Sequence, residues 1–287
     1  MLKEFKNFFI LIILSFILFF PKIYPFNLPD FQIIFFDVGE GDAIFIRTPE
    51  NKKILIDGGA NKKILYLLSK KLSFLETNLD LVILTHPHAD HLNGLIEVIN
   101  SYRVKKILLT GVEYESPNYK YFLELIKLKG IKTIFAKKGQ KIPFKEGEIE
   151  VLYPFEVLVG KKFKDINQSS IVLKVKYKTI TILLPGDIGI ETEKKLVLND
   201  INLKADILKI AHQGSATSTS ELFLQKTNPL IGIISVGENT YGHPSFETLD
   251  RIKNHKIDLL RTDLNGTIEL SCRKKCILKC RKGCNLS

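Results

Sequence analysis

Several residue types are scarce in this chain of 287 residues. It has no tryptophan, one methionine, six histidines and four cysteines. All four cysteines lie in the last sixteen residues, so residues 1–271 can form neither a disulfide framework nor a thiolate metal site. No segment repeats with a period of 20–50 residues, and no long linker interrupts the chain, which excludes a solenoid.

The overall composition is that of a folded protein. Hydrophobic residues make up 45% and charged residues 25%, which argues against disorder and allows one large domain or two small ones. The formal net charge is +11. A basic surface favours a polyanionic partner such as DNA or an anionic membrane surface. The lysines are scattered along the whole chain, so a generally lysine-rich composition explains the charge equally well.

The N-terminal segment, residues 1–29, differs from the rest. Residues 8–20 are uncharged and almost wholly apolar, with Lys3 and Lys6 before them and Pro21 and Lys22 after them. Thirteen residues are short for a membrane span but typical of a signal sequence, and no small-x-small cleavage site follows. We predict an uncleaved signal-anchor that leaves the body extracytoplasmic, because basic residues precede the apolar segment. There are two alternatives. One is a cleaved signal peptide, which would leave the body secreted, and the other is a buried core helix.

Residues 30–271 are predicted to form one domain in which short apolar strands alternate with helices. "FQIIFFDV", "DAIFIRT", "KKILID", "LDLVILT", "SSIVLKVKY", "TITILLPGD", "ADILKIA" and "LIGIISV" have strand patterns, as do residues 106–109, 131–135, 257–261 and 266–271. Helices are expected over 61–74, from about 92, and over 117–128, 189–198, 219–227 and 245–254. Two mixed β-sheets packed face to face, with the helices outside, would bury these strands.

The segment "THPHADH", residues 85–91, holds half of the chain's histidines. It follows "LDLVILT", and loops beyond the carboxyl ends of buried strands are where α/β proteins usually build sites. Pro87 keeps the preceding residue extended, so His86 and His88 point the same way and can chelate one ion. Asp90 and His91 can reach a second ion. Imidazoles and carboxylates are ligands for zinc, with manganese or iron as alternatives.

"HPHADH" after an apolar strand resembles the metallo-β-lactamase superfamily. "FDVGEGDAIFIRTPENKKILIDGG", "ILLPGDI", "ILKIAHQGS", "SVGENTYGHPSFETLDRI" and "LLRTDLNGTIEL" resemble its ComEC-type branch, the hydrolase domain of DNA-uptake competence proteins. These blocks occur in order and cover nearly all of residues 33–270. The resemblance implies an α+β fold, a four-layer αββα sandwich, which agrees with the two face-to-face sheets predicted above.

The resemblance also implies a ligand set for two divalent metal ions, most simply zinc. Asp187 matches the bridging aspartate and His212 the late histidine of the second metal, where many relatives have a further histidine in place of Gln213. Asn167 lies nearest a position where most of the superfamily has a histidine ligand. The alternatives are an Asp187 that caps a helix and a His212 that is an ordinary buried histidine.

Other polar residues are expected to support the ligands or to bind substrate. Asp57 is expected behind the ligands, where a carboxylate can orient an imidazole. Asp90 is expected to orient a metal-activated water and His243 to bind or protonate the leaving group. Arg261, with Thr262 and Asp263, is expected either to contact a phosphate or to form an ordinary strand-end salt bridge. We attribute Asp37 and Asp42 to turn formation and His255 to a solvated helix end.

The expected function is therefore metal-dependent hydrolysis of phosphodiester bonds, with DNA as substrate, outside the cytoplasmic membrane and in a competence-related setting. A chain with at most one span would need a separate DNA-uptake channel protein as its partner. The alternatives are a hydrolase of a small ester, such as a phosphocholine or a lactone, and a non-catalytic DNA-binding module. The sequence does not determine the oligomeric state.

The last segment, residues 272–287, is a basic tail in which Cys272, Cys276, Cys280 and Cys284 recur every four residues. On a helix this spacing would place the four thiols roughly on one face. Three interpretations are open: a four-thiolate metal site, paired disulfides and a flexible basic tail.

Overall fold

The computed structural model describes residues 5, 10, 11, 15 and 29–284. Nearly all of the predicted signal-anchor segment, residues 1–29, therefore lies outside the described residues. Among the residues that are described, no helix is both long enough and apolar enough to cross a membrane.

The first sheet has eight strands in the order β17-β16-β1-β2-β3-β5-β7-β8. The strands are β1 Phe31–Phe35, β2 Ile44–Arg47, β3 Lys53–Ile56, β5 Leu81–Ile83, β7 Lys106–Leu109, β8 Lys132–Phe135, β16 Ile268–Cys272 and β17 Cys276–Cys280. The half from β17 to β3 is antiparallel, and β3, β5, β7 and β8 are parallel. A separate pair, β4 Asn78–Leu79 and β6 Arg103–Val104, lies beside this sheet.

The second sheet has seven strands in the order β15-β14-β13-β12-β11-β10-β9. They are β9 Lys141–Phe144, β10 Gly147–Tyr153, β11 Val172–Tyr177, β12 Ile180–Leu184, β13 Ile207–Lys209, β14 Ile231–Ile234 and β15 Asp258–Arg261. Strands β9 to β12 form an antiparallel meander, whereas β12 to β15 are parallel. Both sheets are thus mixed, as the sequence predicts.

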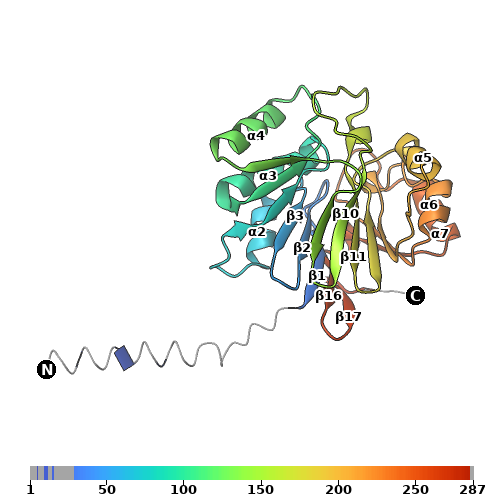
Figure 1. Cartoon of the computed structure of the whole chain (residues 1–287). Coiled ribbons are helices and arrows are strands. Elements are labelled where there is room, and N and C mark those ends of the chain that lie inside the picture. Colours follow the sequence, from blue (N-terminus) through green and yellow to red (C-terminus); the bar gives the residue numbers. More distant parts are fainter. Residues whose placement is uncertain (1–4, 6–9, 12–14, 16–28, 285–287) are drawn as a thin grey trace.

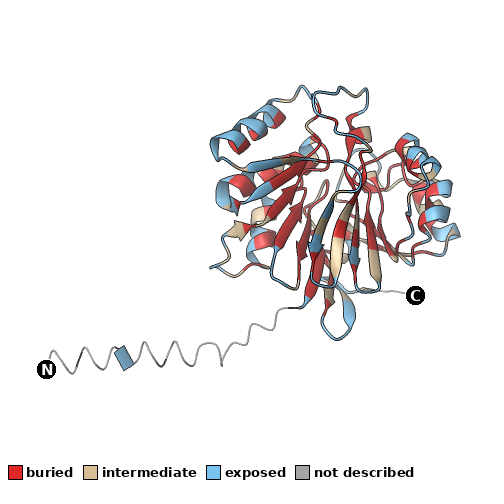
Figure 2. Cartoon of the chain, viewed as in Figure 1, coloured by how far each residue is buried: buried red, intermediate tan, exposed pale blue. Residues whose placement is uncertain are grey.

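The two sheets pack face to face and helices cover both outer faces (Figure 1). One flank carries α2 Lys63–Ser69, α3 Ala89–Ser101 and α4 Pro117–Leu128. The other carries α5 Ile190–Leu198, α6 Glu221–Thr227 and α7 Phe246–Asn254, and a short α8 Thr262–Asn265 follows β15. The strands are mostly buried, whereas the outward faces of the helices are exposed (Figure 2). This arrangement confirms the predicted four-layer αββα sandwich.

Strand β1 shows why these apolar runs lack a polar face. Ile33 and Phe35 belong to the core between the two sheets, while Ile34 and Phe36 belong to the core under α2–α4. Successive side chains of a strand point to opposite faces. A strand covered on both faces is therefore mostly apolar, and a polar exception such as Gln32 has a hydrogen-bond partner, here Glu269.

The boundaries differ from the prediction mainly at helix starts and in one segment. Helix α3 begins at Ala89 and not near residue 92, so His91 lies in its first turn. Strands β9 and β10 were not predicted; lysine and glutamate alternate with apolar residues there, because much of this edge of the sheet is exposed.

The cysteine-rich segment forms an antiparallel hairpin with β16 and not a helix. Cys272 is directly opposite Cys276, and the two are joined by a disulfide; a second disulfide joins Cys280 and Cys284. Of the three interpretations, paired disulfides describe this structure, and no thiol remains free as a metal ligand among the described residues.

Candidate metal centre

The predicted site residues come from loops at the same edge of the two sheets. The loops follow the carboxyl ends of the parallel strands β3, β5, β12, β13 and β14, which is where open α/β sheets place ligands. Close backbone approach is needed there. At Gly41 a Cβ atom would lie 1.8 Å from the Asp90 carbonyl oxygen, and the φ of Gly41, +84°, lies in the left-handed region that favours glycine. A glycine turn therefore lets the β1–β2 loop reach the histidine loop.

The histidine loop brings His86 and His88 together. His88 is the extended residue that precedes α3, and the His86 Nε2 and His88 Nδ1 atoms are 3.2 Å apart. His86 is fully buried, whereas His88 is half-buried and lines a cavity. The loop therefore brings the two rings together, and chelation of one ion by both stays a prediction.

His91 is held by carboxylates on both ring nitrogens. Its Nδ1 atom lies 2.8 Å from Asp57 Oδ2, and its Nε2 atom lies 3.1 Å from Asp187 Oδ2. Asp57 is in turn fixed by Thr85, whose backbone N–H and hydroxyl donate to its two oxygens at 2.8 and 2.6 Å. Asp57 thus orients the imidazole from behind, a geometry known to leave Nε2 free for a metal.

Asp187 uses its two oxygens differently. Oδ1 accepts hydrogen bonds from the His212 backbone N–H at 3.2 Å and from Lys209 Nζ at 3.3 Å. Oδ2 faces His91. The sequence analysis expected one oxygen for each ion, but here Oδ1 already has two donors. The geometry therefore leaves Oδ2 as the oxygen that faces the ligand cluster.

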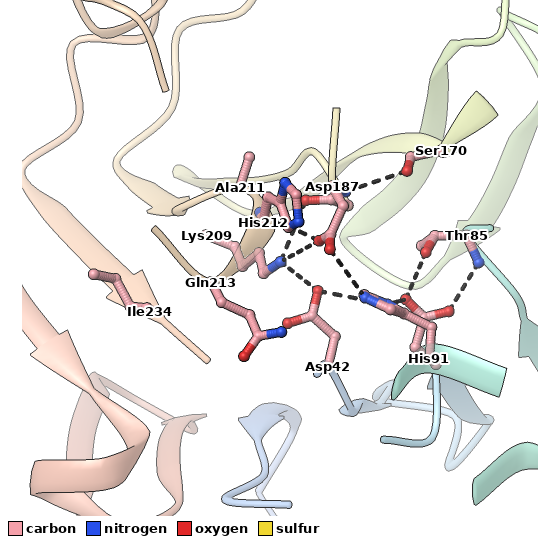
Figure 3. Close-up of polar contacts among 12 residues, drawn as sticks. Asp42, Thr85, His91, Ser170, Asp187, Lys209, Ala211, His212, Gln213 and Ile234 are labelled. Carbon is pink, nitrogen blue, oxygen red and sulfur yellow. Dashed lines mark hydrogen bonds and ion pairs between the residues drawn. The ribbon is translucent and has the colours of Figure 1, made fainter. Parts of the chain in front are cut away.

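Lys209 is the main residue that the sequence analysis missed. Its side chain is fully buried between Asp42, with which it forms an ion pair, and Asp187 (Figure 3). Asp42 was attributed to turn formation, but it is 2% exposed and its Oδ2 lies 4.0 Å from His91 Nδ1. The available signal was a single lysine inside the apolar strand "ADILKIA", where a charge requires a buried partner.

The outer residues of the site are more open. Asp90 has a 20% exposed side chain and accepts a hydrogen bond from Gln213 Nε2 at 3.0 Å. His212 and His243 lie with ring centroids 5.5 Å apart. A cavity of about 470 Å³ is lined by both histidines and by Asp90 and Asp187. A second cavity of about 380 Å³ shares Asp187 and His212 with the first. Asp187 and His212 therefore lie where two surface cavities meet.

Of two further predicted site residues, Asn167 lines a cavity of the site, whereas Arg261 forms a salt bridge. Asn167 is buried in the 3₁₀ turn Ile166–Ser169, lines the second cavity, and its Oδ1 atom has no hydrogen-bond partner among the described residues. Arg261 instead forms a bidentate pair with Asp263, at 3.1 and 2.6 Å. The sequence analysis left two roles open for Arg261, a phosphate contact and a strand-end salt bridge. The structure shows the salt bridge. His255 likewise pairs with Glu221 at 2.7 Å, away from the site.

The electrostatics of the cluster depend on burial and on an excess of acids. Burial lowers the pKa of His86 well below its usual value, so its ring is neutral. Burial would also lower the pKa of His91, but the carboxylates of Asp187, Asp90 and Asp57 raise it well above the usual value. Burial would raise the pKa of Asp187, yet the charges of His91 and Lys209 hold it well below its usual value.

The Asp42–Lys209 pair remains ionised at neutral pH. Burial raises the pKa of Asp42 to about 6, although Lys209 opposes the rise. Burial would lower the pKa of Lys209, but Asp42 and Asp187 raise it above its usual value. The carboxylates of Asp42 and Asp187 thus both favour the charged ammonium form of Lys209.

The residues present fit divalent cations. Four carboxylates, those of Asp42, Asp57, Asp90 and Asp187, lie within 4.0 Å of His91, and the ammonium of Lys209 contacts two of them, Asp42 and Asp187. Nitrogen and oxygen atoms of His86, His91 and Asp187 all lie within 4.8 Å of one another. The Asn167 Oδ1 atom, which has no hydrogen-bond partner among the described residues, is a further oxygen available to a cation. Imidazole and carboxylate together are a donor set for zinc, manganese or iron.

An αββα sandwich with a histidine–aspartate cluster at the strand ends is a metallo-hydrolase architecture. Residues 36–238 match the Metallo-beta-lactamase superfamily. The chain belongs to that superfamily. The metallo-beta-lactamase fold protein YhfI from Bacillus subtilis superposes on 84% of this chain and 99% of its own with a TM-score of 0.55, at 13% identity, which shows the fold alone.

Two curated relatives extend the comparison. The chain is 31% identical to ComE operon protein 3 of Bacillus subtilis (strain 168) over 271 residues, which are 88% of this chain and 34% of that protein. It is 28% identical to Competence protein ComA of Neisseria gonorrhoeae over 263 residues, 91% of this chain and 35% of that protein. The chain thus spans about a third of the length of these relatives. They support the predicted resemblance to competence proteins.

Proposed function

We propose that this protein is a metal-dependent phosphodiesterase that hydrolyses DNA. The observation that carries the proposal is the convergence of six residues: the buried His86 and His91 contact a group of residues that lines one cavity, His88, Asp90, Asp187 and His212. The net charge of +11 and the similarity to a competence protein favour a polyanionic substrate over a neutral ester.

Two divalent ions, most simply zinc, would supply an activated water at neutral pH and neutralise charge on a phosphodiester. His86, His88 and Asn167 would hold one ion, and Asp90, His91 and His212 the other, with Asp187 between them. The chain's own groups do the remaining work. Asp90, which accepts a hydrogen bond from Gln213, would orient the attacking water, and Asp57 holds His91 in one orientation.

His243 would serve the leaving group. It lines the open cavity beside His212, and its Nδ1 atom is buried without a hydrogen-bond partner among the described residues. Burial and the charge of His212 lower its pKa. The ring is therefore neutral at pH 7, so its N–H group would donate a hydrogen bond to the departing oxygen and not a full proton.

The proposed setting is extracytoplasmic, with the N-terminal segment at the membrane and a separate DNA-uptake channel protein as partner. The two disulfides of the terminal hairpin support an oxidising compartment, because disulfides persist mainly outside the cytosol.

The test is cleavage of single- and double-stranded DNA by the purified full chain with zinc or manganese. We expect cleavage, and we expect His86→Ala to lower the rate by more than about a hundredfold, since loss of a ligand exceeds loss of an outer partner. His255→Ala is the matched control, because His255 is paired with Glu221 outside the site. DNA that stays intact with both metals would refute the proposal, and turnover of small esters alone would favour the rival hydrolase.

A further inference from the structure

Two tyrosines flank the opening of the site. Tyr241 and Tyr114 both line the 470 Å³ cavity that contains Asp90 and His212. Tyr241 is 70% exposed and Tyr114 is 36% exposed. Aromatic rings of this size usually bury most of their surface. Two exposed rings at one cavity can bury that surface against a ligand that has a flat face.

Each tyrosine rests against a histidine of the site. The Tyr241 ring stacks on His243, with centroids 6.0 Å apart and an interplanar angle of 24°. The Tyr114 ring meets His88 edge to face at 5.9 Å. The inner surface of each ring is thus occupied by the site itself, and a ligand that contacts either tyrosine lies beside the candidate metal ligands.

The loop that carries Tyr241 is held in place by one side chain. Asn239 Nδ2 donates to the carbonyl oxygens of Gly237 and His243 at 2.9 and 2.8 Å, and Asn239 Oδ1 accepts from the backbone N–H groups of Tyr241 and His243 at 3.1 and 3.0 Å. All polar groups of the Asn239 amide are used within the loop. Tyr241 is therefore presented on a preorganised support, which lowers the entropy lost when a ligand stacks on it.

We propose that Tyr241, assisted by Tyr114, is a stacking platform for a nucleobase of single-stranded DNA next to the scissile phosphate. The inference rests on the proposed function and specifies its substrate class. Every base has an aromatic face, so stacking on tyrosine tolerates any sequence. In a duplex those faces are covered by neighbouring base pairs, so the platform selects single strands. Tyr241 is a substrate-positioning residue, and the hydrolytic chemistry remains with the histidine–aspartate cluster.

The first experiment measures binding by the full chain with zinc present, using a fluorescein-labelled thymidine oligonucleotide with a phosphorothioate backbone that resists hydrolysis. A second oligonucleotide has the same backbone but abasic residues. We expect Tyr241→Ala to weaken binding of the thymidine oligonucleotide about tenfold or more and to leave binding of the abasic one unchanged. Tyr241→Phe should bind both as the wild type does. Tyr66→Ala is the matched control, because Tyr66 is 56% exposed but does not line this cavity.

The second experiment measures cleavage of the unmodified thymidine oligonucleotide. Tyr241→Ala should raise KM more than it lowers kcat, because the ring positions substrate and does not touch the reacting atoms. If the wild type cleaves DNA but Tyr241→Ala keeps its preference for thymidine over abasic strands, the platform is wrong and the proposed hydrolysis stands. If the preference disappears but no strand is ever cut, the platform stands and hydrolysis fails. If the wild type binds neither oligonucleotide, or binds both equally, the platform is wrong.

Discussion

The inner and outer halves of the candidate metal centre differ in how completely they are fixed. The inner residues, His86, His91, Asp57, Asp187 and Lys209, are at most 2% exposed, and nearly all of their polar atoms have partners. The outer residues, His88, Asp90, His212 and His243, are partly exposed and border the cavity.

This difference separates two requirements of a hydrolytic site. Buried groups with satisfied hydrogen bonds keep their positions before a metal arrives, because moving them would break bonds in a medium of low dielectric. Partly exposed groups can meet a substrate and exchange protons with water. Substitutions in the inner half should therefore destabilise the fold as well as weaken metal binding. Substitutions in the outer half should leave the fold intact and act on metal binding or on turnover, according to whether the residue is a proposed ligand.

The largest expected effect is that of Lys209→Met. The change leaves Asp42 and Asp187 buried without their shared cation, and breaking a buried pair from one side typically destabilises a protein by about 3–5 kcal/mol. Urea unfolding of the metal-free protein measures this loss. Lys105→Met is the control: Lys105 pairs with Asp80 at the surface and is 55% exposed, so its loss should cost less than about 1 kcal/mol. Equal losses in the two variants would mean that the inner half is not held by Lys209.

A smaller effect is expected for Asp57→Asn. The amide keeps the size of the side chain but removes the charge that holds His91 Nδ1, and loss of such an outer partner typically lowers metal affinity about 10–100-fold. Competition with a chelator measures the affinity. His243→Ala, in the outer half, should leave zinc affinity within a few-fold of the wild type while it slows turnover. A loss of affinity in His243→Ala as large as that in Asp57→Asn would break the distinction between the halves.

The histidine loop and the fold were predictable because their signals are local. "THPHADH" follows a strand that is apolar at every position, and apolar strands of that kind require cover on both faces. Family resemblance then placed Asp187, His212 and Asn167 near the loop, and the structure brings them to one edge. Their roles as ligands stay a prediction.

Asp42 and Lys209 could not be assigned locally, because each residue's meaning depends on the other. They are 167 positions apart, and their pairing requires that the first sheet's β1–β2 loop meet the end of β13 in the second sheet. A lysine in a buried strand predicts a carboxylate partner but does not say which of the 31 acidic residues supplies it. The hairpin of the tail was missed for a similar reason: a four-residue spacing suits a helix, and only pairing with β16 places Cys272 opposite Cys276.

The smallest expected effect is the release of protons when zinc binds. It distinguishes the inner and outer halves of the metal centre by the charge on their histidines. Three carboxylates raise the pKa of His91 well above its usual value in the metal-free protein, so the ring carries an extra proton at pH 7 that a metal must displace. Apparent zinc affinity should therefore fall about tenfold for each unit that the pH drops below that pKa.

Calorimetry at pH 7 in two buffers of different ionisation enthalpy should show about one proton released per chain from His91. Asp57→Asn should release fewer, since one of the three charges is gone, whereas the release should be unchanged in His243→Ala, because burial already lowers the pKa of His243 and leaves its ring neutral. Zinc binding without proton release in the wild type would show that His91 is neutral before the metal arrives and that the inner acids do not control it.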